Sequence, residues 1–466
     1  MTNYRFRSRI DNEAYRLPIK PNQDLEHIPG PKAGWIGRHI FRFLKNDNDH
    51  IAYLAEKYGD VFSMPSLIGR KAVFMVGAEA NKVVLGNADK IFSNHRAYLP
   101  IKMFVGDSVA TRDFEDHAEL RKLISQPFSG SAMPDYLARI NENCDKHFKK
   151  MVYHRNNEVQ FYPFVKALAL DIAADVFAGI ELGSEAGKMN KSLQQILNLV
   201  NAKIPIPLPG TVVAKGLKGR SYADGYFRSL IPSRRESKST DLFTRLCIAE
   251  NDLGERLNDQ DIIDNVIGAM IAGHDTSTIA MTALAYELAK SPDRQSKLAA
   301  KCETIHQQTG AKFLKHSDLS QLGEIDLYIK EVLRMYTPVR YIQRRLVKDF
   351  EFKGHKLFAN TNVILAIHQT HLSRECFEHP ERFYPERFGN NSKYSKIPNY
   401  AWAPFGKGAH LCIGMQFAML EIKALLYHLL INYEIQLPTN HSLEMSGIPV
   451  SKPKGNVPLV LKPRNT

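Results

Sequence analysis

The residues most able to do chemistry in this chain lie around one cysteine. Residues 405–414 read Phe-Gly-Lys-Gly-Ala-His-Leu-Cys-Ile-Gly, and an apolar run at helical spacing follows at 417–426. Backbone N–H groups of such a loop can point at the sulfur of Cys412, and the positive end of the next helix lies beside it. Both features lower the pKa of a thiol, and a thiolate binds metal ions. We therefore predict that Cys412 is a metal ligand; the alternative is a small buried hydrophobic side chain, the commoner role of a lone cysteine.

A second candidate lies at the centre of a long apolar segment. Asn258 is a suitable N-cap and Pro292 marks the end, so we predict a helix of about thirty residues that spans about 45 Å. Apolar side chains surround the axis of this helix, which indicates a buried position. Its centre, residues 272–278, reads Ala-Gly-His-Asp-Thr-Ser-Thr. A bend in the helix would account for the glycine and for Thr276, but a buried carboxylate such as Asp275 is costly unless it is paired or functional.

Two pairs of charged residues are weak signals alone but become informative through their order along the chain. Glu331 and Arg334 share one helix face at spacing i, i+3, and His117 and Arg121 share another at i, i+4. Taken alone, a pair such as Glu331 and Arg334 lies on the surface and contributes about 0.3–0.5 kcal/mol, and a basic pair such as His117 and Arg121 is a solvated stripe. Arg387 follows the first pair, within the run Pro-Glu-Arg-Phe-Tyr-Pro-Glu-Arg-Phe, and the cysteine loop comes last.

In this order the motifs resemble those of the cytochrome P-450 superfamily of haem-thiolate monooxygenases. The loop matches the pattern Phe-x-x-Gly-x-His-x-Cys-x-Gly, and residues 272–276 match Ala/Gly-Gly-x-Asp/Glu-Thr. The resemblance covers about residues 28–463 and rests on an ordered set of four motifs. One departure is that residues 357–361, Leu-Phe-Ala-Asn-Thr, lack the Pro-x-Gly that the family often has there. The strand register near the pocket is therefore open.

The resemblance implies a haem cofactor, heme b (iron protoporphyrin IX), with the Cys412 thiolate as axial iron ligand. It makes Thr276 and Asp275 the alcohol and acid that deliver protons to dioxygen, with Gly273 leaving space for that oxygen. Arginine suits a haem propionate because its guanidinium meets a carboxylate bidentately. The propionate contacts it implies are His117, Arg121, Arg344 and His410. Other cofactor contacts it implies are Phe405, Gly406, Gly414 and Ala272. The buried charge triad it implies on the haem side is Glu331, Arg334 and Arg387.

The resemblance also locates the segments that contact substrate. The apolar loop at 204–210, Ile-Pro-Ile-Pro-Leu-Pro-Gly, lies where the family has a lid between two helices, and its alternate prolines exclude helix and strand interiors. We expect the remaining pocket residues to be apolar or aromatic, as a lipid-like or terpenoid substrate requires. They are Tyr98, Leu99, Ile101, Met103, Phe104, Ala269, Ala272, Val339 and Tyr341.

Hydrophobic periodicity predicts a mainly α fold with small β-sheets. Helical periodicity dominates from about residue 119 to about residue 330, and no alternating strand–helix rhythm occurs. Strands are expected within residues 57–64, 71–76, 350–352, 363–367, 434–437 and 457–461. We expect an N-terminal arm, residues 1–27, without a membrane anchor, because it contains no apolar segment long enough to span a bilayer. One catalytic domain with the cytochrome P-450 fold follows, at residues 28–466.

Composition excludes several other classes. The five cysteines in 466 residues are scattered and include no Cys-x-x-Cys pair, which favours a reducing compartment over a disulfide framework. The net charge is +13, but the basic residues are spread along the chain and no nucleic-acid-binding motif occurs. We therefore expect a cytoplasmic protein that binds no nucleic acid. Eukaryotic members of the resembled family commonly carry an N-terminal anchor, so its absence from residues 1–27 points to a soluble protein of the bacterial type, which we expect to be a monomer.

The activity implied by the resemblance is insertion of one atom of dioxygen into a hydrophobic small molecule, usually as C–H hydroxylation. Electrons would come from a ferredoxin or flavodoxin with its NAD(P)H reductase, and we expect this partner to dock on a basic face containing Lys407, Lys122 and Lys423. Fatty acids, retinoids, sterols and terpenoids are the candidate substrates. The cysteine loop and its helix resemble the retinoid- and sterol-oxidising branches more than the camphor type.

Two alternatives share the same cofactor. One is a peroxide-driven hydroxylase on the same fold, and such enzymes typically lack the Asp275–Thr276 pair. The other is a haem-binding sensor or sequestering protein, which would need no such pair either. Turnover with an electron-transfer system separates an enzyme from the second alternative.

Overall fold

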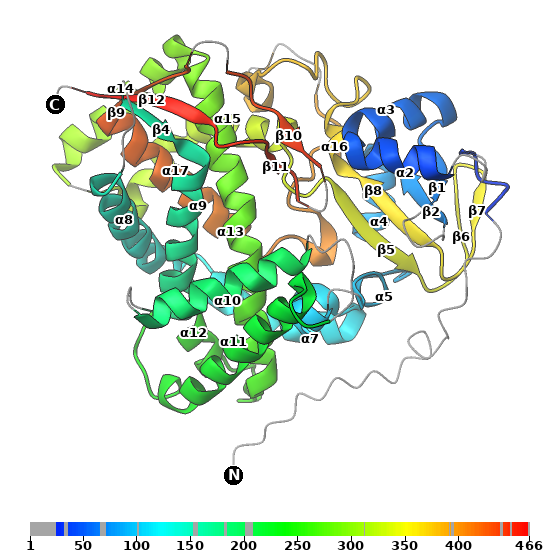
Figure 1. Cartoon of the computed structure of the whole chain (residues 1–466), viewed down its shortest axis with the longest axis horizontal. Helices are drawn as coiled ribbons and strands as arrows, with labels where there is room; N and C mark the ends of the chain where they lie inside the picture. The colour runs from blue at the N-terminus through cyan, green and yellow to red at the C-terminus, as the bar shows by residue number, and fades with distance from the viewer. Residues whose placement is uncertain are drawn as a thin grey trace.

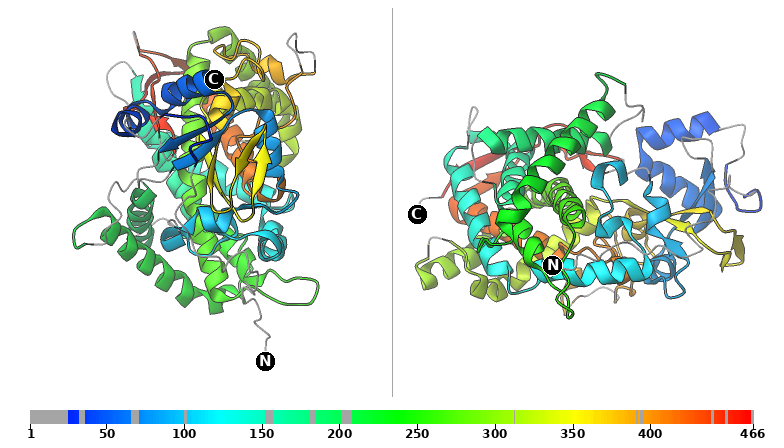
Figure 2. Two further views of the ribbon diagram at one scale, coloured as in Figure 1. Left: turned by 90° about the vertical axis from the view of Figure 1, so that its right-hand side faces the viewer. Right: turned by 90° about the horizontal axis from the view of Figure 1, so that it is seen from below.

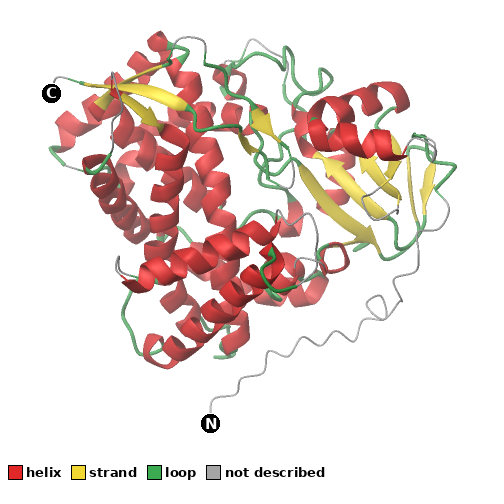
Figure 3. Cartoon of the chain, viewed as in Figure 1, coloured by secondary structure: helices red, strands yellow, loops and turns green. Residues whose placement is uncertain are grey.

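The computed structural model describes residues 25–31, 36–65, 71–99, 102–151, 157–180, 184–200, 208–311, 313–390, 392, 396–438, 441–447 and 450–464. Helices predominate in these residues and the strands form small sheets, which confirms the predicted fold class (Figure 3). The helical part and the largest sheet lie side by side in Figure 1 and in the right-hand view of Figure 2.

The α-helices differ greatly in length, and the longest is α13 (Asp259–Ala289). A π-helical turn, η6 (Ala173–Phe177), continues one of them, and a 3-10 turn, η9 (Gly408–His410), lies in the cysteine loop. The other α-helices are α2 (Ile36–Lys45), α3 (Asp47–Tyr58), α4 (Ala78–Gly86), α5 (Asn94–Ala97), α6 (Lys102–Val105), α7 (Phe114–Ser125), α8 (Met133–Lys149), α9 (Phe161–Ile172), α10 (Ser184–Val200), α11 (Val212–Arg234), α12 (Leu242–Ile248), α14 (Pro292–Thr309), α15 (Gly323–Met335), α16 (Ile367–His371) and α17 (Met415–Asn432).

The strands of the described residues form one larger mixed sheet, in the order β1-β2-β8-β5-β3, and three smaller pieces, β4-β12-β9, β6-β7 and β10-β11. In the larger sheet β2 and β8 run parallel and the other neighbours are antiparallel. The strands are β1 (Val61–Pro65), β2 (Lys71–Met75), β3 (Phe92–Ser93), β4 (Glu158–Gln160), β5 (Tyr341–Leu346), β6 (Phe350–Phe352), β7 (His355–Leu357), β8 (Asn362–Ala366), β9 (Tyr433–Gln436), β10 (Met445–Ser446), β11 (Lys452–Pro453) and β12 (Pro458–Pro463).

Every predicted β-rich piece contains a strand, and the register near the pocket is now defined. β5 pairs with β8 so that Tyr341 lies opposite Ala366 and Arg344 opposite Val363. In place of the expected Pro-x-Gly, Asn360 takes a left-handed φ of 70° and its side chain accepts a hydrogen bond from Arg96 at 2.8 Å. Asparagine tolerates this conformation better than most residues, so the turn before β8 forms without glycine.

Helix α13 begins and ends close to the predicted residues. The Asn258 side chain accepts a hydrogen bond from the backbone N–H of Asp261 at 2.9 Å, which caps the helix. Its 31 residues correspond to about 46 Å. The helix packs against α9, α11, α15 and α17, which bury most of its residues from Asp261 to Ala289 (Figure 1). Apart from Asp259 and Gln260 in the first turn, the accessible residues of the helix lie near its middle, between residues 268 and 276.

Parts of two predicted segments lie outside the described residues: 1–24 of the N-terminal arm and 204–207 of the apolar lid. The rest of the lid leads into α11, and its Leu208 is mostly exposed. In the described part of the chain, one stretch, Gly408–Asn432, is apolar and long enough to cross a membrane by composition and length. Its helix α17 packs against α8, α13 and α14, which is the environment of a core helix.

Candidate active site at the cysteine loop

The cysteine loop needs glycine at two positions. Gly406 and Gly408 have φ values of 69° and 67°, in the left-handed region. A Cβ on Gly408 would lie 2.1 Å from the carbonyl oxygen of Leu85 in α4, so a larger residue could not pass this helix. The backbone N–H of Cys412 donates to the carbonyl of Phe405 at 2.8 Å. This bond closes the loop and fixes Cys412 just before α17.

Cys412 is accessible to solvent, whereas the four other cysteines are buried. Protein atoms nevertheless crowd its thiol, and this burial raises the pKa of Cys412 above the ordinary value. The N–H of Gly414 and the charge of Arg121 act in the opposite direction. The predicted lowering of the thiol pKa is therefore wrong for the side chain on its own, because lost hydration outweighs both effects. The buried cysteines are Cys144, Cys247, Cys302 and Cys376.

Four basic side chains converge beside this thiol. The rings of His117 in α7 and His410 in the loop lie 3.9 Å apart between centroids. Burial and the charges of Arg121 and Arg344 lower the pKa of His117 to about 4. Burial, His117 and the same two arginines lower the pKa of His410 to about 2. The structure thus brings together all four residues that were predicted to contact the propionates, with both imidazoles neutral at pH 7.

Arg344, in β5, indicates which kind of ligand these four basic side chains can bind. Arg344 is buried, and its Nη1 donates to the carbonyl of Gln343 at 2.8 Å. Its Nε has no hydrogen-bond partner among the described residues. Burial lowers the pKa of Arg344, and a buried charged donor without an acceptor is costly. Carboxylates satisfy guanidinium donors well, so this donor set fits the two propionates of a haem.

The middle of α13 presents the accessible face of that helix. Ala269, Ala272 and Thr276 share one side at spacing i, i+3 and i+7, and none of them is fully buried. The Thr276 hydroxyl donates to the carbonyl of Ala272 at 2.7 Å, a contact that bends helices. A Cβ on Gly273 would lie 2.9 Å from the ring of Phe177, so close packing against η6 also requires glycine here. This second requirement was not visible in the sequence.

Asp275 contacts His274 rather than Thr276, the residue with which its motif pairs it. No hydrogen bond joins it to Thr276 among the described residues, since successive helix residues point about 100° apart. Its Oδ1 lies 3.0 Å from Nδ1 of His274, which is fully buried. Burial raises the pKa of Asp275, but His274, Lys166 and Lys452 outweigh it and hold the pKa below the ordinary value. His274 stands at the variable position of the motif, and neither its Nδ1 nor Oδ1 of Asp275 has a hydrogen-bond partner among the described residues.

The predicted charge triad is present and buried. Arg334 donates from Nε and Nη2 to the two carboxylate oxygens of Glu331, at 2.8 Å each. Arg387 donates to the same carboxylate at 3.0 Å, and the backbone N–H of Tyr384 does so at 2.9 Å. The remaining guanidinium donors bind backbone carbonyls, including those of residues 371, 378 and 380. The triad therefore ties α15 to the segment that leads to the cysteine loop.

The prediction that Tyr341 lines the substrate pocket is wrong. The ring of Tyr341 packs against Phe43 and Phe74, and its hydroxyl donates to Asp47 at 2.8 Å. These contacts place Tyr341 in the core between the sheet and α2–α3. Side chains alternate along a strand, and the periodicity of β5 alone could not tell which face this residue takes.

The other pocket predictions differ in how far the structure describes them. The Tyr98 hydroxyl accepts a hydrogen bond from the N–H of Gln343 at 3.4 Å, beside the cation cluster. Leu99 is exposed, and Val339 is half-buried. Ile101 and the side chains of Met103 and Phe104 lie outside what the structure describes.

The segment at residues 107–109, which follows the predicted pocket residues 98–104, is held by side chains that belong to none of the sequence motifs. Asp264 of α13 accepts a hydrogen bond from the backbone N–H of Asp107 at 2.7 Å, and Asn265 accepts one from Val109 at 2.9 Å. The side-chain amide of Asn94 lies 2.8 Å from Nδ1 of His410 and donates to it. These contacts join segments far apart in sequence, so only the fold reveals them.

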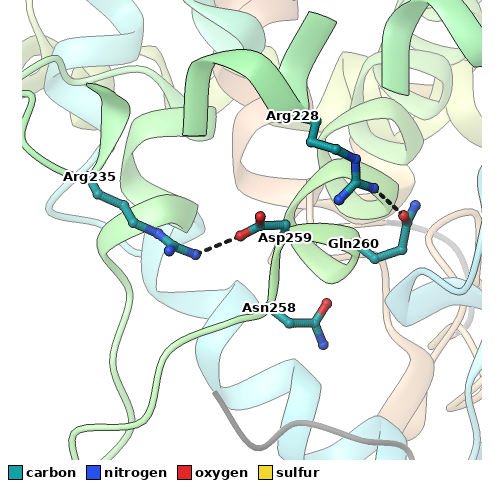
Figure 4. Close-up of a pocket in the computed structure, with 5 residues that line it drawn as sticks. All are labelled: Arg228, Arg235, Asn258, Asp259 and Gln260. Atoms are coloured by element: carbon teal, nitrogen blue, oxygen red, sulfur yellow. Dashed lines mark hydrogen bonds and ion pairs between the residues drawn. The ribbon is translucent and has the colours of Figure 1, made fainter. Parts of the chain in front are cut away.

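A separate surface pocket of about 400 Å³ lies between the end of α11 and the start of α13 (Figure 4). Arg235 binds Asp259 at 2.9 Å across it, and Arg228 binds Gln260. Asn258 completes the lining. These residues bind one another and lie away from the cysteine loop, so we assign the pocket no part in the chemistry.

Comparison with known proteins agrees with this geometry. The family model described as Cytochrome P450 matches residues 28–459. A Mycobacterium tuberculosis protein named cytochrome P450 136 is 33% identical over 454 residues, covering 95% of this chain and 90% of that protein. Taxane 10-beta-hydroxylase of Taxus cuspidata is 30% identical and covers 88% and 83%. The solved structure of retinoic acid-bound cyanobacterial CYP120A1 superposes with a TM-score of 0.81 at 25% identity and covers 91% and 96%.

The chain belongs to the cytochrome P450 family. It is an oxidoreductase of the monooxygenase type, and the family implies a haem with cysteine thiolate ligation, dioxygen as co-substrate and a source of electrons.

Proposed function

We propose that this protein hydroxylates a hydrophobic small molecule at a haem bound by Cys412. The observation that carries the proposal is the arrangement of an accessible thiol beside four basic residues, one of which keeps a buried, unpartnered nitrogen. A thiolate-ligated haem supplies the activation of dioxygen. The chain's own residues orient that cofactor: Arg121, Arg344, His117 and His410 bind its carboxylates, and the closed loop holds the sulfur.

The substrate we propose is a terpenoid or retinoid-like lipid. The relatives named for taxane hydroxylation and for bound retinoic acid support this class. The pocket would be lined by Tyr98, Leu99, Ala269, Ala272 and Val339, with residues of the loop at 101–104. Purified protein titrated with retinoids, diterpenoids, triterpenoids, sterols and fatty acids should show a shift of the haem Soret band only with members of the first three groups. A response confined to fatty acids would contradict this class.

Thr276→Ala should uncouple the reaction without loss of the fold. The change removes a hydroxyl at the accessible face of α13 and the bond to Ala272, so haem content and substrate-induced spectral change should stay near wild type. Loss of a positioned proton donor typically costs about 10²–10⁴ in rate, so product per reductant should fall and hydrogen peroxide should rise. If Thr276 only bends the helix, thermal stability and haem retention will fall together with activity. Stable, fully coupled Thr276→Ala protein would remove this residue from the mechanism.

We also propose that a separate ferredoxin or flavodoxin, with its NAD(P)H reductase, delivers electrons at a basic face near the cysteine loop. The expected face must be revised, because Lys423 is buried and binds Asp326 at 2.7 Å. Lys122 is exposed and Lys407 is partly exposed. Lys122, which follows Arg121 in α7, and Lys407, in the cysteine loop, define the revised face.

Lys407→Glu and Lys122→Glu should each slow reduction of the haem by the partner, and raised salt should do the same in the wild type. The reason is that exposed charges are screened over a Debye length of about 10 Å at 0.1 M. Lys462→Glu, an exposed position on β12, is the matched control and should reduce at the wild-type rate. Reduction rates that do not change with salt or with Lys407→Glu would argue against this face.

We infer that the protein works as a soluble, monomeric cytoplasmic enzyme, with residues 1–27 as an arm and residues 28–466 as one catalytic domain. The relation to a bacterial protein of similar length supports this assignment. Sedimentation of the purified full-length chain would test the oligomeric state.

A further inference from the structure

A buried histidine outside the sequence motifs links the cysteine loop to the end of α15. His371 is the last residue of α16, and its side chain is fully buried. Its Nε2 lies 3.1 Å from the backbone nitrogen of Ala403 and accepts that N–H. Its Nδ1 lies 2.8 Å from Oγ1 of Thr337, which follows α15. The imidazole therefore bridges two segments that lie far apart in the sequence.

These two contacts fix which ring nitrogen carries the hydrogen. A backbone N–H can only donate, so Nε2, which accepts from Ala403, is bare, and the hydrogen of the neutral ring lies on Nδ1. Nδ1 then donates to Oγ1 of Thr337. The Thr337 hydroxyl donates in turn to the carbonyl of Leu333 at 2.9 Å or to that of Arg334 at 3.1 Å. Each hydrogen along this path from the loop to α15 therefore has an acceptor.

The surroundings keep the ring neutral. Burial and the charge of Arg334 lower the pKa of His371 to about 3. Nη1 of the same arginine donates to the backbone carbonyl of His371 at 2.9 Å, which holds the positive charge close to the imidazole. A second proton on Nε2 would also oppose the N–H of Ala403 in a buried site, where such repulsion is strong. Nε2 is therefore a permanent acceptor at neutral pH.

The contact with Ala403 leads directly to the cysteine. The carbonyl of Ala403 accepts the N–H of Gly406 at 3.0 Å, which closes a turn over residues 403–406. Within that turn the carbonyl of Phe405 accepts the N–H of Cys412 at 2.8 Å. A displacement of Ala403 would therefore move the acceptor that fixes the backbone of Cys412.

We propose that His371 is a positioning residue for the axial thiolate. Its bare Nε2 holds the turn at 403–406 through the N–H of Ala403, and the turn in turn holds Cys412. Residues that orient a metal ligand from outside the ligand set control how firmly the metal is held. The inference rests on the proposed function, because it concerns the cysteine as a haem ligand, and it adds a residue that acts on this ligand through the backbone.

Two amide substitutions separate the contact with Ala403 from the bulk of the side chain. A glutamine amide reaches about as far as Nε2, so Oε1 of His371→Gln can still accept the N–H of Ala403. An asparagine amide ends near the position of Nδ1, so His371→Asn keeps a donor for Thr337 and leaves that N–H without an acceptor. Both variants should fold, because the indole of Trp402 also ties this segment to α15, by donating to the carbonyl of Lys330 at 3.1 Å.

The ferrous carbonyl spectrum of the haem-loaded variants measures the effect without turnover. At a temperature where circular dichroism stays native, His371→Asn should lose the red-shifted Soret band about tenfold faster than the wild type, the lower end of what a residue outside the ligand set contributes. His371→Gln should stay close to the wild-type rate. Equal rates for the two variants would mean that the imidazole only fills space, and would overturn the proposal.

His368→Asn is the matched control. His368 lies one turn earlier in α16 and is also buried, and its Nδ1 lies 3.2 Å from the same Thr337 hydroxyl. Among the described residues no hydrogen bond joins its ring to Ala403. This variant should therefore keep the wild-type rate of band loss, and a loss as fast as that of His371→Asn would overturn the proposal.

The tautomer of His371 gives a second readout in the wild type. In the diamagnetic ferrous carbonyl form, ¹⁵N-histidine-labelled protein should show His371, assigned by its loss in His371→Gln, as a neutral ring with its hydrogen on Nδ1 at pH 7. A hydrogen on Nε2 would overturn the proposal, and this spectrum decides the contact even where His371→Asn fails to load haem. A wild type that binds haem without the red-shifted band would overturn the proposed function and this role together. A red-shifted band with the other tautomer would overturn this role alone.

Discussion

Cys412→Ser should abolish oxygen-dependent product formation. A serine hydroxyl stays protonated at neutral pH, whereas a thiol can ionise on binding metal, and only the thiolate gives the haem the electron density that oxygen activation needs. The change replaces one small side chain at an accessible position of a loop closed by backbone bonds, so the fold should persist. Turnover with reductant, dioxygen and an identified substrate measures the loss.

Cys302→Ala is the matched control for this substitution. Cys302 is fully buried in α14, and burial raises its pKa to about 12, so it stays a neutral thiol. Its replacement should lower stability slightly and leave activity per haem unchanged. Product formation by Cys412→Ser above the level of free haem would exclude Cys412 as the ligand.

Glu331→Gln should destabilise the protein by about 3–5 kcal/mol, the usual cost of removing one partner from a buried ion pair. The change leaves Arg334 and Arg387 buried beside a neutral amide, and all three side chains are almost completely inaccessible. Since domains are stable by only about 5–15 kcal/mol, we expect a large drop in the urea midpoint and loss of haem. Glu381→Gln, an exposed acid in the adjoining segment, should unfold like the wild type. A wild-type midpoint for Glu331→Gln would mean that the triad does not hold this region together.

The elements that could be predicted from the sequence are those with a strong local signal. Helix α13 has a capping asparagine, a proline after its end and apolar residues on all sides, and the structure has it almost where predicted. The β-rich pieces all contain strands, because runs of branched and aromatic residues lead to few other structures. Short strands such as β3 and β11 have two residues each and carry no such signal.

Site residues were predictable where a motif fixes them and not where the fold brings them together. Spacing placed Glu331 and Arg334 on one helix face, but the direction of Tyr341 depends on which face of β5 meets α2–α3. A lysine is expected at the surface because of its charge, but in α17 the side chain of Lys423 is buried and binds Asp326. His274 occupies the variable position of its motif, and the carbonyl that it contacts belongs to α9, more than a hundred residues away, so the sequence gives no sign of this contact.

The absorption spectrum of the reduced, haem-loaded wild-type protein under carbon monoxide tests the central claim most directly. It reports the axial ligand of the haem and requires neither a substrate nor a redox partner. We predict the red-shifted Soret band of a thiolate-ligated haem, and its disappearance in Cys412→Ser with the same haem content. A wild-type Soret band at the position typical of histidine-ligated haem, or a red-shifted band that persists in Cys412→Ser, would contradict the account.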